Sequence, residues 1–454
     1  MINWYISLYL GIILLLYLFP YVGSFPSIKA YCESHMGYGG LSSGTNLLLS
    51  RLVSGELLVY AMFSVISFGL LGGIGFTLMV LASLLIFILT IHKLKKNKEE
   101  QGILHLLRKQ TDKAGFRYHM LIFVGVSFGN MILQLACLKY LLGHYFLQSS
   151  ILIVFFVSIF SFAYAGLGGF DALNKGAKPQ VFIVFFSTAV ITISVFLENG
   201  LAVTYQDIIT IPFNPLDFPD AAIIFSTGLI ILSSQYLLDH SLWHTVYQLR
   251  PQRQYPILLL TVFCVLAVPL GYSALTVYSL SQGMPTNESL ILILEKNSSL
   301  FLINLYVITV FVTVISSYAN QLLSTVILYL NYREPEQMVE SKAIKYGYLF
   351  SAISVIIVLV SFLTLQNFSL NQILIVLGIL YASMVIPFIH TLFRSSAPNR
   401  WIDYIGLVPL TIGIVLWLSK ELYYSPLISL VLGILIQMSI LFFSKIYKEI
   451  TKTQ

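Results

Sequence analysis

Charged side chains are scarce in this chain. Only 10% of its 454 residues are Asp, Glu, Lys or Arg, whereas 57% are hydrophobic and the mean hydropathy is +0.87. A soluble globular protein carries about 25% charged residues, so that class is excluded. Apolar runs of roughly 20 residues recur along the sequence, and each is long enough to cross a bilayer as a helix. The chain is therefore predicted to be an all-α, multi-span membrane protein surrounded by a lipid bilayer.

Cysteines are also few. Cys32, Cys137 and Cys264 show no Cys-x-x-Cys spacing, which argues against a disulfide framework or a cysteine metal site. Phosphate-loop and His-Glu-x-x-His patterns are missing, and the segments between the apolar runs are too short for a soluble domain. The net charge of +6 is spread along the chain rather than clustered. We therefore expect no enzyme activity, no organic cofactor and no nucleic-acid partner, which leaves transport, channel activity, lipid chemistry or sensing within the membrane.

Thirteen membrane spans are predicted within one transmembrane domain over residues 1–454. The first, at 2–20, has no basic segment before it and no small-residue cleavage site after it, so we expect a retained helix and a mature chain that begins at Met1. The other twelve are predicted at 46–70, 72–92, 116–142, 147–166, 181–198, 221–244, 256–280, 298–331, 346–366, 371–392, 402–419 and 426–446.

The distribution of Lys and Arg predicts the orientation. With the N-terminus outside, 22 of the 25 basic residues fall on the cytoplasmic side or at the inner end of the second span, and Lys139, Lys296 and Lys420 fall outside. This asymmetry follows the positive-inside rule and favours an odd number of spans. We therefore expect a plasma-membrane protein with its N-terminus outside and its C-terminus in the cytoplasm.

Two spans carry residues that disfavour a regular apolar helix. The second contains SRLVSGE, with Arg51 and Glu56, and the seventh contains SSQYLLDHSLWH, with Asp239, His240 and His244. Irregular backbone inside a membrane is tolerated where it lines a cavity, and ionisable residues at that depth usually mark a pathway or a site. Two broken helices five spans apart are typical of an inverted five-plus-five repeat. We predict a first repeat over 46–198, a second over 221–392 and C-terminal helices over 402–446.

Four stretches resemble the sodium:solute symporter family in order and spacing. They are VSGE in the second span, YAGLGGFDALNKGAKPQ at 164–180, DHSLWHTV at 239–246 and TVISSYANQLLST at 313–325. The chain departs from the family pattern at Ala177, where an Asp is expected, and at His240, His244 and Thr245, which stand for Gln, Gln and Arg. The resemblance implies the leucine-transporter fold, with one extra N-terminal helix, ten core helices and two C-terminal helices.

The same resemblance implies a sodium site between the second and ninth spans. Its ligands would be the main-chain carbonyls of Ser50, Val53 and Thr313 and the hydroxyls of Ser316 and Ser317. Such oxygens suit a hard cation. The family pattern has an Asp in some members where this chain has Leu52, and Arg51 beside it would repel a cation unless its charge is neutralised or points to the inner surface.

Helical geometry places polar residues of the ninth span on one stripe, independently of the resemblance. The stripe contains Thr313, Ser316, Ser317, Asn320 and Ser324, at spacings of three and four residues. Two interpretations are open. The stripe lines a binding site, or its hydroxyls bond to their own helix and join neighbouring helices.

Six residues are candidates for substrate contact: Ser54, Glu56, Gln235, Asp239, His240 and Asn320. Glu56 is alternatively a proton carrier, or a partner for a helix end or a basic side chain. His240 and His244 are four residues apart, but with no third ligand evident a metal site is the weaker interpretation.

These observations predict a secondary active transporter that couples sodium to the symport of a small organic solute by alternating access. Two alternatives remain: a proton-coupled or uncoupled transporter of the same fold, or a non-transporting scaffold or sensor with an unidentified protein partner. A membrane-embedded transferase is disfavoured because no paired carboxylates share a surface.

Overall fold

A computed structural model describes residues 25, 27–33, 40–97, 102–143, 150–199, 218–281, 300–332, 340–393, 404–420 and 423–452. Apart from turns, caps and one isolated bridge residue, this part of the chain is helical. The predicted span at 2–20 lies outside the described residues. The chain divides into two units, the first made of residues 1–81, 130–217 and 248–370 and the second of residues 82–129, 218–247 and 371–454.

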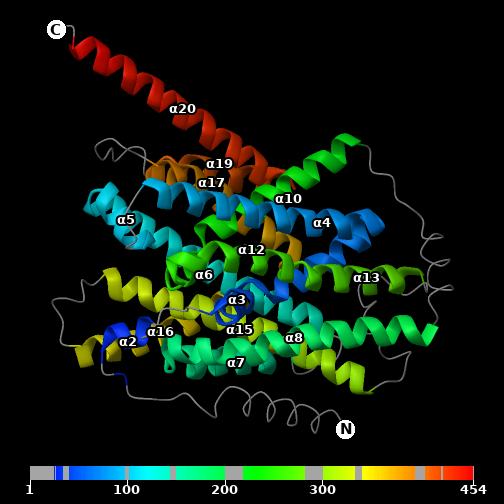
Figure 1. Ribbon diagram of the computed structural model, residues 1–454. Helices are drawn as coiled ribbons and strands as arrows, with labels where there is room; N and C mark the ends of the chain where they lie inside the picture. Colours follow the sequence, from blue (N-terminus) through cyan, green and yellow to red (C-terminus); the bar gives the residue numbers. More distant parts are fainter. Residues whose placement is uncertain are drawn as a thin grey trace. The chain divides into compact units, whose positions relative to one another are not determined.

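The first unit is built around one long buried helix, α15 (Leu300–Tyr332). It packs against α3 (Leu41–Leu52), α7 (Ser150–Ser161), the π-helical turn η1 (Phe162–Gly166), α8 (Gly169–Asn199) and α16 (Glu340–Thr364) (Figure 1). Nearly every side chain of α15 from Tyr306 to Leu328 is buried, although many of them are polar. A helix that is buried all round in a membrane protein must satisfy its polar groups against neighbouring helices.

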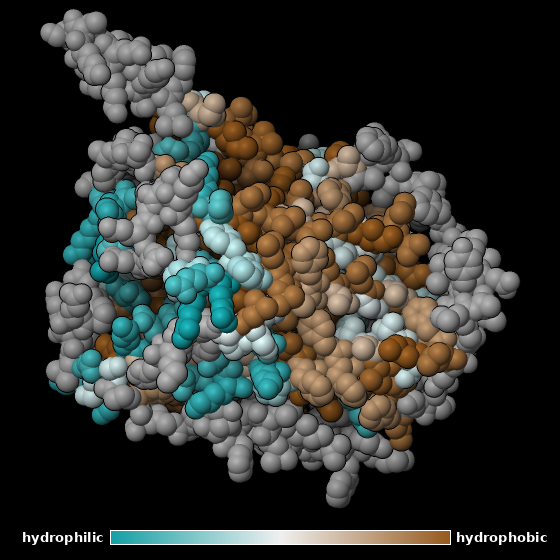
Figure 2. Space-filling view, viewed as in Figure 1, coloured by the Kyte–Doolittle hydropathy of each residue, from teal (hydrophilic) through white to brown (hydrophobic). Residues whose placement is uncertain are grey.

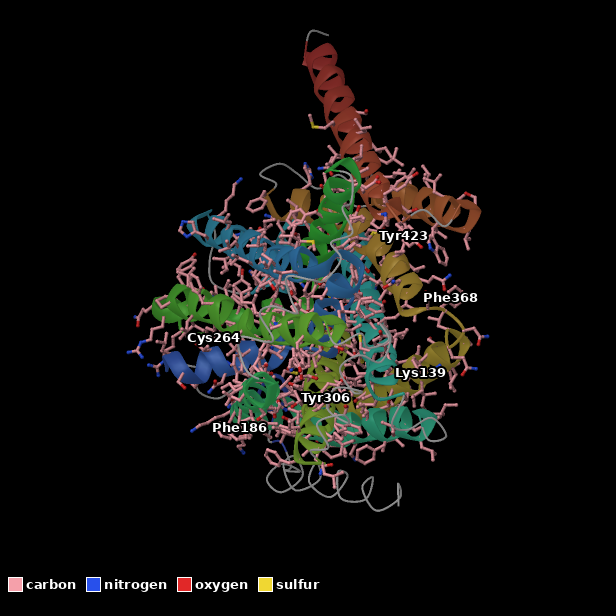
Figure 3. The ribbon with its side chains drawn as sticks, turned by 90° about the vertical axis from the view of Figure 1, so that its right-hand side faces the viewer. Lys139, Phe186, Cys264, Tyr306, Phe368 and Tyr423 are labelled. Carbon is pink, nitrogen blue, oxygen red and sulfur yellow. The ribbon has the colours of Figure 1, made fainter. Side chains whose placement is uncertain are left out.

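The other helices of the first unit cover this centre. They are α2 (Ile28–Cys32), the first part of α4 (Gly55–Asn97), the end of α6 (Lys113–Leu142), the short η2 (Pro251–Arg253), α12 (Gln254–Val265) and α13 (Ala267–Ser281). Figure 3 shows Tyr306 of α15 and Phe186 of α8. The Tyr306 side chain is buried, with its hydroxyl 3.5 Å from the Leu141 carbonyl, whereas Phe186 is 46% exposed. Apolar side chains thus face both the interior and the outer surface, as expected in lipid.

The chain folds back on itself inside α4. Gly69 has φ 63 and ψ −154, which glycine adopts without a steric penalty. A Cβ atom placed on Gly72 would lie 1.9 Å from the Ser64 carbonyl oxygen, although residues eight apart in a continuous helix are separated by about 12 Å. The helix is therefore two antiparallel segments joined at Gly69. This reversal lies at the boundary between the predicted spans 46–70 and 72–92.

The second unit contains the rest of α4 and most of α6, together with α5 (Ile103–Gln110), α10 (Phe218–Leu238), α11 (His240–Tyr247), α17 (Leu370–Phe393), α19 (Leu407–Lys420) and α20 (Ser425–Lys452). Within it, α20 packs against α10 and α19, and α5 contacts α11. Ile375, Ile379 and Trp417 form a small apolar core.

The helices agree with a multi-span membrane protein. Seven described helices are long and apolar enough to cross a membrane, or eight if the bent pair α10 and α11 is one span. Figure 2 shows mostly hydrophobic side chains on the surface over α12 and α13, where Leu259, Phe263 and Leu270 are exposed. The all-helical, multi-span class is confirmed. The count of thirteen spans and the repeat boundaries stay predictions.

Candidate functional site

The first break in a membrane helix lies between α3 and α4. Helix α3 ends at Leu52, Val53 is extended with φ −77 and ψ 104, and α4 begins at Gly55. The Val53 N–H still bonds to the Leu49 carbonyl at 2.9 Å, but the helical ladder stops there, so the carbonyls of residues 50–52 lie beyond its last hydrogen bond. Two side chains secure the start of α4: Gln134 Oε1 accepts the Gly55 N–H at 3.0 Å, and Ser54 Oγ accepts the Leu57 N–H at 3.4 Å. The predicted interruption at SRLVSGE is therefore present.

Ser316 of α15 meets this break. Its hydroxyl oxygen lies 2.5 Å from the Ser50 carbonyl oxygen and 2.7 Å from Gln180 Oε1 of α8. All three residues are buried. The hydroxyl therefore joins the broken end of α3 to two other helices instead of only bonding within its own helix.

The remaining predicted ion ligands lie on the same two elements. Thr313 is buried one turn before Ser316, and its hydroxyl bonds to the Val310 carbonyl at 3.0 Å, while Ser317 is buried beside Ser316 in the sequence. Val53 supplies an extended backbone segment at the break. The structure thus brings Ser50 and Ser316 into direct contact. Val53 lies near Ser50 at the end of α3, and Thr313 and Ser317 lie near Ser316 on α15.

Arg51 points to α15. Its Nε donates to Asn320 Oδ1 at 3.2 Å, and Asn320 Nδ2 donates to the Ser316 carbonyl at 2.9 Å. Arg51 and Glu56 are the two buried residues among the Asp, Glu, Lys and Arg side chains that the structure describes. The guanidinium is therefore one amide group away from Ser316. These bonds engage both the oxygen and the nitrogen of the side-chain amide of Asn320, which is a candidate substrate ligand.

Gln180 was not among the predicted site residues, although it fits the family pattern. It is 4% exposed, and its Nε2 lies 3.4 Å from the Tyr164 hydroxyl oxygen, which itself donates to the Ala172 carbonyl at 2.9 Å. Gly176 makes room for this tyrosine, because a Cβ there would lie 2.0 Å from the hydroxyl. The sequence signal that could have found Gln180 is its position in NKGAKPQ, beside the proline at 179 inside α8.

Glu56 lies in the first turn of α4 and is 5% exposed. A carboxylate at a helix N-terminus interacts favourably with the N–H groups that have no helical partner. This position agrees with the interpretation that Glu56 pairs with a helix end, and it also puts the carboxylate at the break, where a solute contact is expected.

The second break lies between α10 and α11, which are bent by 54°. Asp239 Oδ1 accepts the N–H groups of Ser241 at 2.8 Å and Leu242 at 3.3 Å, so it caps α11. Trp243 Nε1 donates to the Leu237 carbonyl at 2.7 Å. The predicted interruption is present here too, and its backbone groups are satisfied by side chains of the same short segment.

The other predicted residues of this span lie around the cap. Gln235 is buried in α10, and the His240 ring lies 5.6 Å from Phe123 and 6.1 Å from His244. Within the described ranges, no group of three or more His, Cys, Asp or Glu side chains could hold a metal ion. Gln235, Asp239 and His240 belong to the second unit, whereas Ser54, Glu56 and Asn320 belong to the first.

One sequence pattern resembles a catalytic motif, but its position in the fold excludes that role. GVSFG at 125–129 matches the Gly-x-Ser-x-Gly letters of serine hydrolases, but it lies inside the continuous helix α6, and Ser127 is buried. A serine nucleophile of that type needs a sharp strand-to-helix turn that exposes its hydroxyl. The pattern therefore forms no such site.

Comparison with solved structures identifies the fold. A Na+-coupled sialic acid symporter in a substrate-bound outward-open state matches with a TM-score of 0.74 and 14% identity over 97% of this chain and 97% of that chain. The chain shares the fold of this symporter. A nucleobase-cation-symport-1 family transporter with bromovinylhydantoin bound matches with a TM-score of 0.57 and 14% identity, over 92% of this chain and 95% of that chain. A manganese transporter of Eremococcus coleocola matches with a TM-score of 0.55 and 14% identity, over 92% and 98%.

This transporter fold is not accompanied by a sequence match. No family model matches the chain, and no curated protein does. The resemblance to the sodium:solute symporters is thus confirmed at the level of the fold, as the leucine-transporter type shared with the sialic acid symporter.

Proposed function

We propose that this chain is a secondary active transporter that moves a small organic solute by alternating access, driven by sodium. The observation that carries the proposal is the contact between the Ser316 hydroxyl and the Ser50 carbonyl, because it joins a broken helix to a polar helix face in a chain with a symporter's fold. In such folds, ions and substrates bind where membrane helices are interrupted.

The coupling ion would be held by Ser50, Val53, Thr313, Ser316 and Ser317. Neutral oxygens that are buried away from water suit a hard monovalent cation, and Ser50, Ser316 and Ser317 are each less than 9% exposed. By binding across α3 and α15, the ion would favour one arrangement of these helices over the other, which is the differential affinity that coupling requires.

Six residues are proposed solute contacts: Ser54, Glu56 and Asn320 at the first break, in the first unit, and Gln235, Asp239 and His240 at the second break, in the second unit. Of these, Glu56 and Asp239 bring carboxylates, which fits a solute with hydroxyl or amino groups. We further propose thirteen spans in the plasma membrane, with the N-terminus outside and the C-terminus in the cytoplasm.

Arg51 favours a second candidate, a transporter of this fold that is coupled to protons or is uncoupled. Its guanidinium is held near Ser316 through Asn320, and a fixed positive charge at this place disfavours a cation.

The test begins with a thermal-stability screen of the purified protein against a metabolite library, which selects the solute. Uptake of that solute into proteoliposomes is then measured under a sodium gradient, under a pH gradient and with neither. We expect uptake to follow the sodium gradient and Ser316→Ala to remove at least about 90% of the sodium-driven component, because buried sites depend steeply on each polar ligand.

The matched control is Thr309→Val on the same helix, whose hydroxyl bonds to the Leu305 carbonyl of its own helix at 2.8 Å. It should leave uptake unchanged. Uptake without any sodium dependence, with Ser316→Ala and Ser317→Ala both silent, would contradict the sodium assignment. No solute response together with a stoichiometric co-purifying partner would instead favour a scaffold or sensor.

A further inference from the structure

Three oxygen atoms meet at Ser316 with too few hydrogens between them. The Ser316 hydroxyl oxygen lies 2.5 Å from the Ser50 carbonyl oxygen and 2.7 Å from Gln180 Oε1. A serine hydroxyl has one hydrogen, and both neighbours are acceptors. One of the two short oxygen pairs is therefore without a proton, which is repulsive unless a positive charge lies among the three oxygens.

The orientation of the Gln180 amide decides whether this deficit is real. Rotating the amide by half a turn would place its NH2 group at Ser316 and its oxygen at Tyr164, and glutamine orientations are assigned from their hydrogen-bond partners. Tyr164 already donates its hydrogen to the Ala172 carbonyl at 2.9 Å, so its oxygen is left as an acceptor for Gln180 Nε2 at 3.4 Å. In an empty site the lack of hydrogens would favour the rotated amide. A cation among the oxygens removes that repulsion, and the Tyr164 contact then holds the carbonyl toward Ser316.

These oxygens are held in a built environment. Ser50, Gln180 and Ser316 are 4%, 4% and 2% exposed. They come from α3, α8 and α15, which pack against one another in pairs within the first unit. Gly176 lets Tyr164 approach α8 closely, which fixes the far end of the Gln180 amide. A set of ligands that is rigid and dehydrated before the ion binds discriminates between ions better than a mobile set does.

We propose that Gln180 is a cation ligand, whose side-chain carbonyl joins the Ser50 carbonyl and the Ser316 hydroxyl around one monovalent cation. This inference rests on the proposed function and extends its ion site to a third helix. The set is neutral, whereas sites for calcium or magnesium use carboxylates, and the nearby guanidinium of Arg51 further disfavours a divalent ion. Sodium is the hard monovalent ion that such oxygens suit. An ion held this way would tie α8 to the α3 and α15 pair.

The test compares Gln180→Leu, which removes the carbonyl at similar size, with Gln180→Glu, which adds a negative charge. For each, the thermal unfolding temperature of the full chain in detergent is titrated with sodium chloride at constant ionic strength against potassium chloride and choline chloride. Each sample serves as its own reference, so a lower baseline stability does not affect the result.

We expect half-saturating sodium to rise at least tenfold in Gln180→Leu and to fall severalfold in Gln180→Glu. If Gln180 has only a structural role, the half-saturating sodium concentration should shift in the same direction in both variants or stay unchanged. Either result overturns the proposal. If Gln180→Leu does not fold, Gln180→Glu decides alone, since tighter sodium binding supports the ligand role and unchanged or weaker binding overturns it. Gln254→Leu, a buried glutamine of α12, is the matched control and should keep the wild-type sodium response.

The sodium titrations distinguish the role of Gln180 from the existence of the sodium site as a whole. A wild-type sodium response that both Gln180 variants leave unchanged overturns the role of Gln180 and leaves the sodium site of the proposed function intact. A wild-type protein without any sodium response overturns the cation site as a whole, and solute uptake under a pH gradient then decides whether transport remains.

Discussion

The two broken helices solve the same backbone problem in different ways. At the break between α10 and α11, the Asp239 carboxylate caps the following helix and the Trp243 indole covers the Leu237 carbonyl, so residues within seven positions close the gap. At the break between α3 and α4, Ser54 caps the start of α4 locally, but the other side-chain contacts come from distant residues: Gln134 of α6 and Ser316 of α15, with Gln180 of α8 behind Ser316.

This difference has a consequence for function. A break closed by its own residues keeps its geometry whatever its neighbours do. A break held by side chains of two other helices, with a third helix behind one of them, keeps its geometry only while those helices stay together, so an ion that replaces or reinforces the contacts can control it. The α3 break is therefore the better candidate for coupling, and the α10 break the better candidate for a fixed hinge or a solute contact.

The largest effect is expected at the second break from Trp243→Ala. Trp243 is fully buried and its ring meets Phe87 edge-on at 4.9 Å. Losing the ring should lower the free energy of unfolding by about 3–5 kcal/mol, seen as a lower unfolding temperature in detergent. Trp243→Phe keeps most of the ring, so its smaller loss reports the bond to Leu237. A changed sodium response in either variant would contradict the separation between the two breaks.

An intermediate effect is expected at the first break from Arg51→Gln. Removing a positive charge that is one amide group from Ser316 should lower half-saturating sodium on the order of tenfold, because like charges in a poorly screened interior repel. The variant should also lose about 1 kcal/mol of stability with the bond to Asn320. Sodium titration of thermal unfolding measures both. Arg51→Lys keeps the charge and should stay near wild type; equal sodium responses in all three proteins would remove Arg51 from the ion site.

The smallest effect is expected from Asp239→Asn. Asparagine caps a helix about as well as aspartate, so thermal stability should change by less than about 0.5 kcal/mol, whereas Asp239→Ala should lose about 1 kcal/mol. Solute uptake by the asparagine variant separates the two roles of this residue. Normal uptake would show that the carboxylate is only a cap, and lost uptake with unchanged stability would support the predicted solute contact.

Much of the architecture follows from local pattern. The described helices overlap the apolar segments predicted from 46 to 446, because a bilayer requires long apolar segments and tolerates little else. The number of spans and their boundaries stay predictions. The boundary at Gly69 and both breaks were also predictable, since glycine, serine and charged residues interrupt apolar runs locally. The short helices α2 and α5 lie in segments predicted only as loops, because they are too short to give a span-length signal.

The contacts that define the candidate site were harder to predict. The direction of the Arg51 side chain, toward Asn320 rather than the inner surface, depends on a residue 269 positions away, and the Ser316 contact to Gln180 spans 136 positions. Composition and periodicity carry no information on such pairs. The polar stripe on the ninth span could be located from helical spacing, but which of its hydroxyls reaches a second helix is decided by packing.

The reversal in α4 bears on how experiments that mutate every position should be interpreted. At Gly72 even an alanine would place its Cβ 1.9 Å from a backbone oxygen, while at Gly125 nothing lies within 4 Å of the same atom. A mutational scan should therefore find Gly72 intolerant and Gly125 permissive, although neither residue belongs to the proposed ion or solute site. Intolerance to substitution in this protein thus marks places where two backbones touch as well as places where transport takes place.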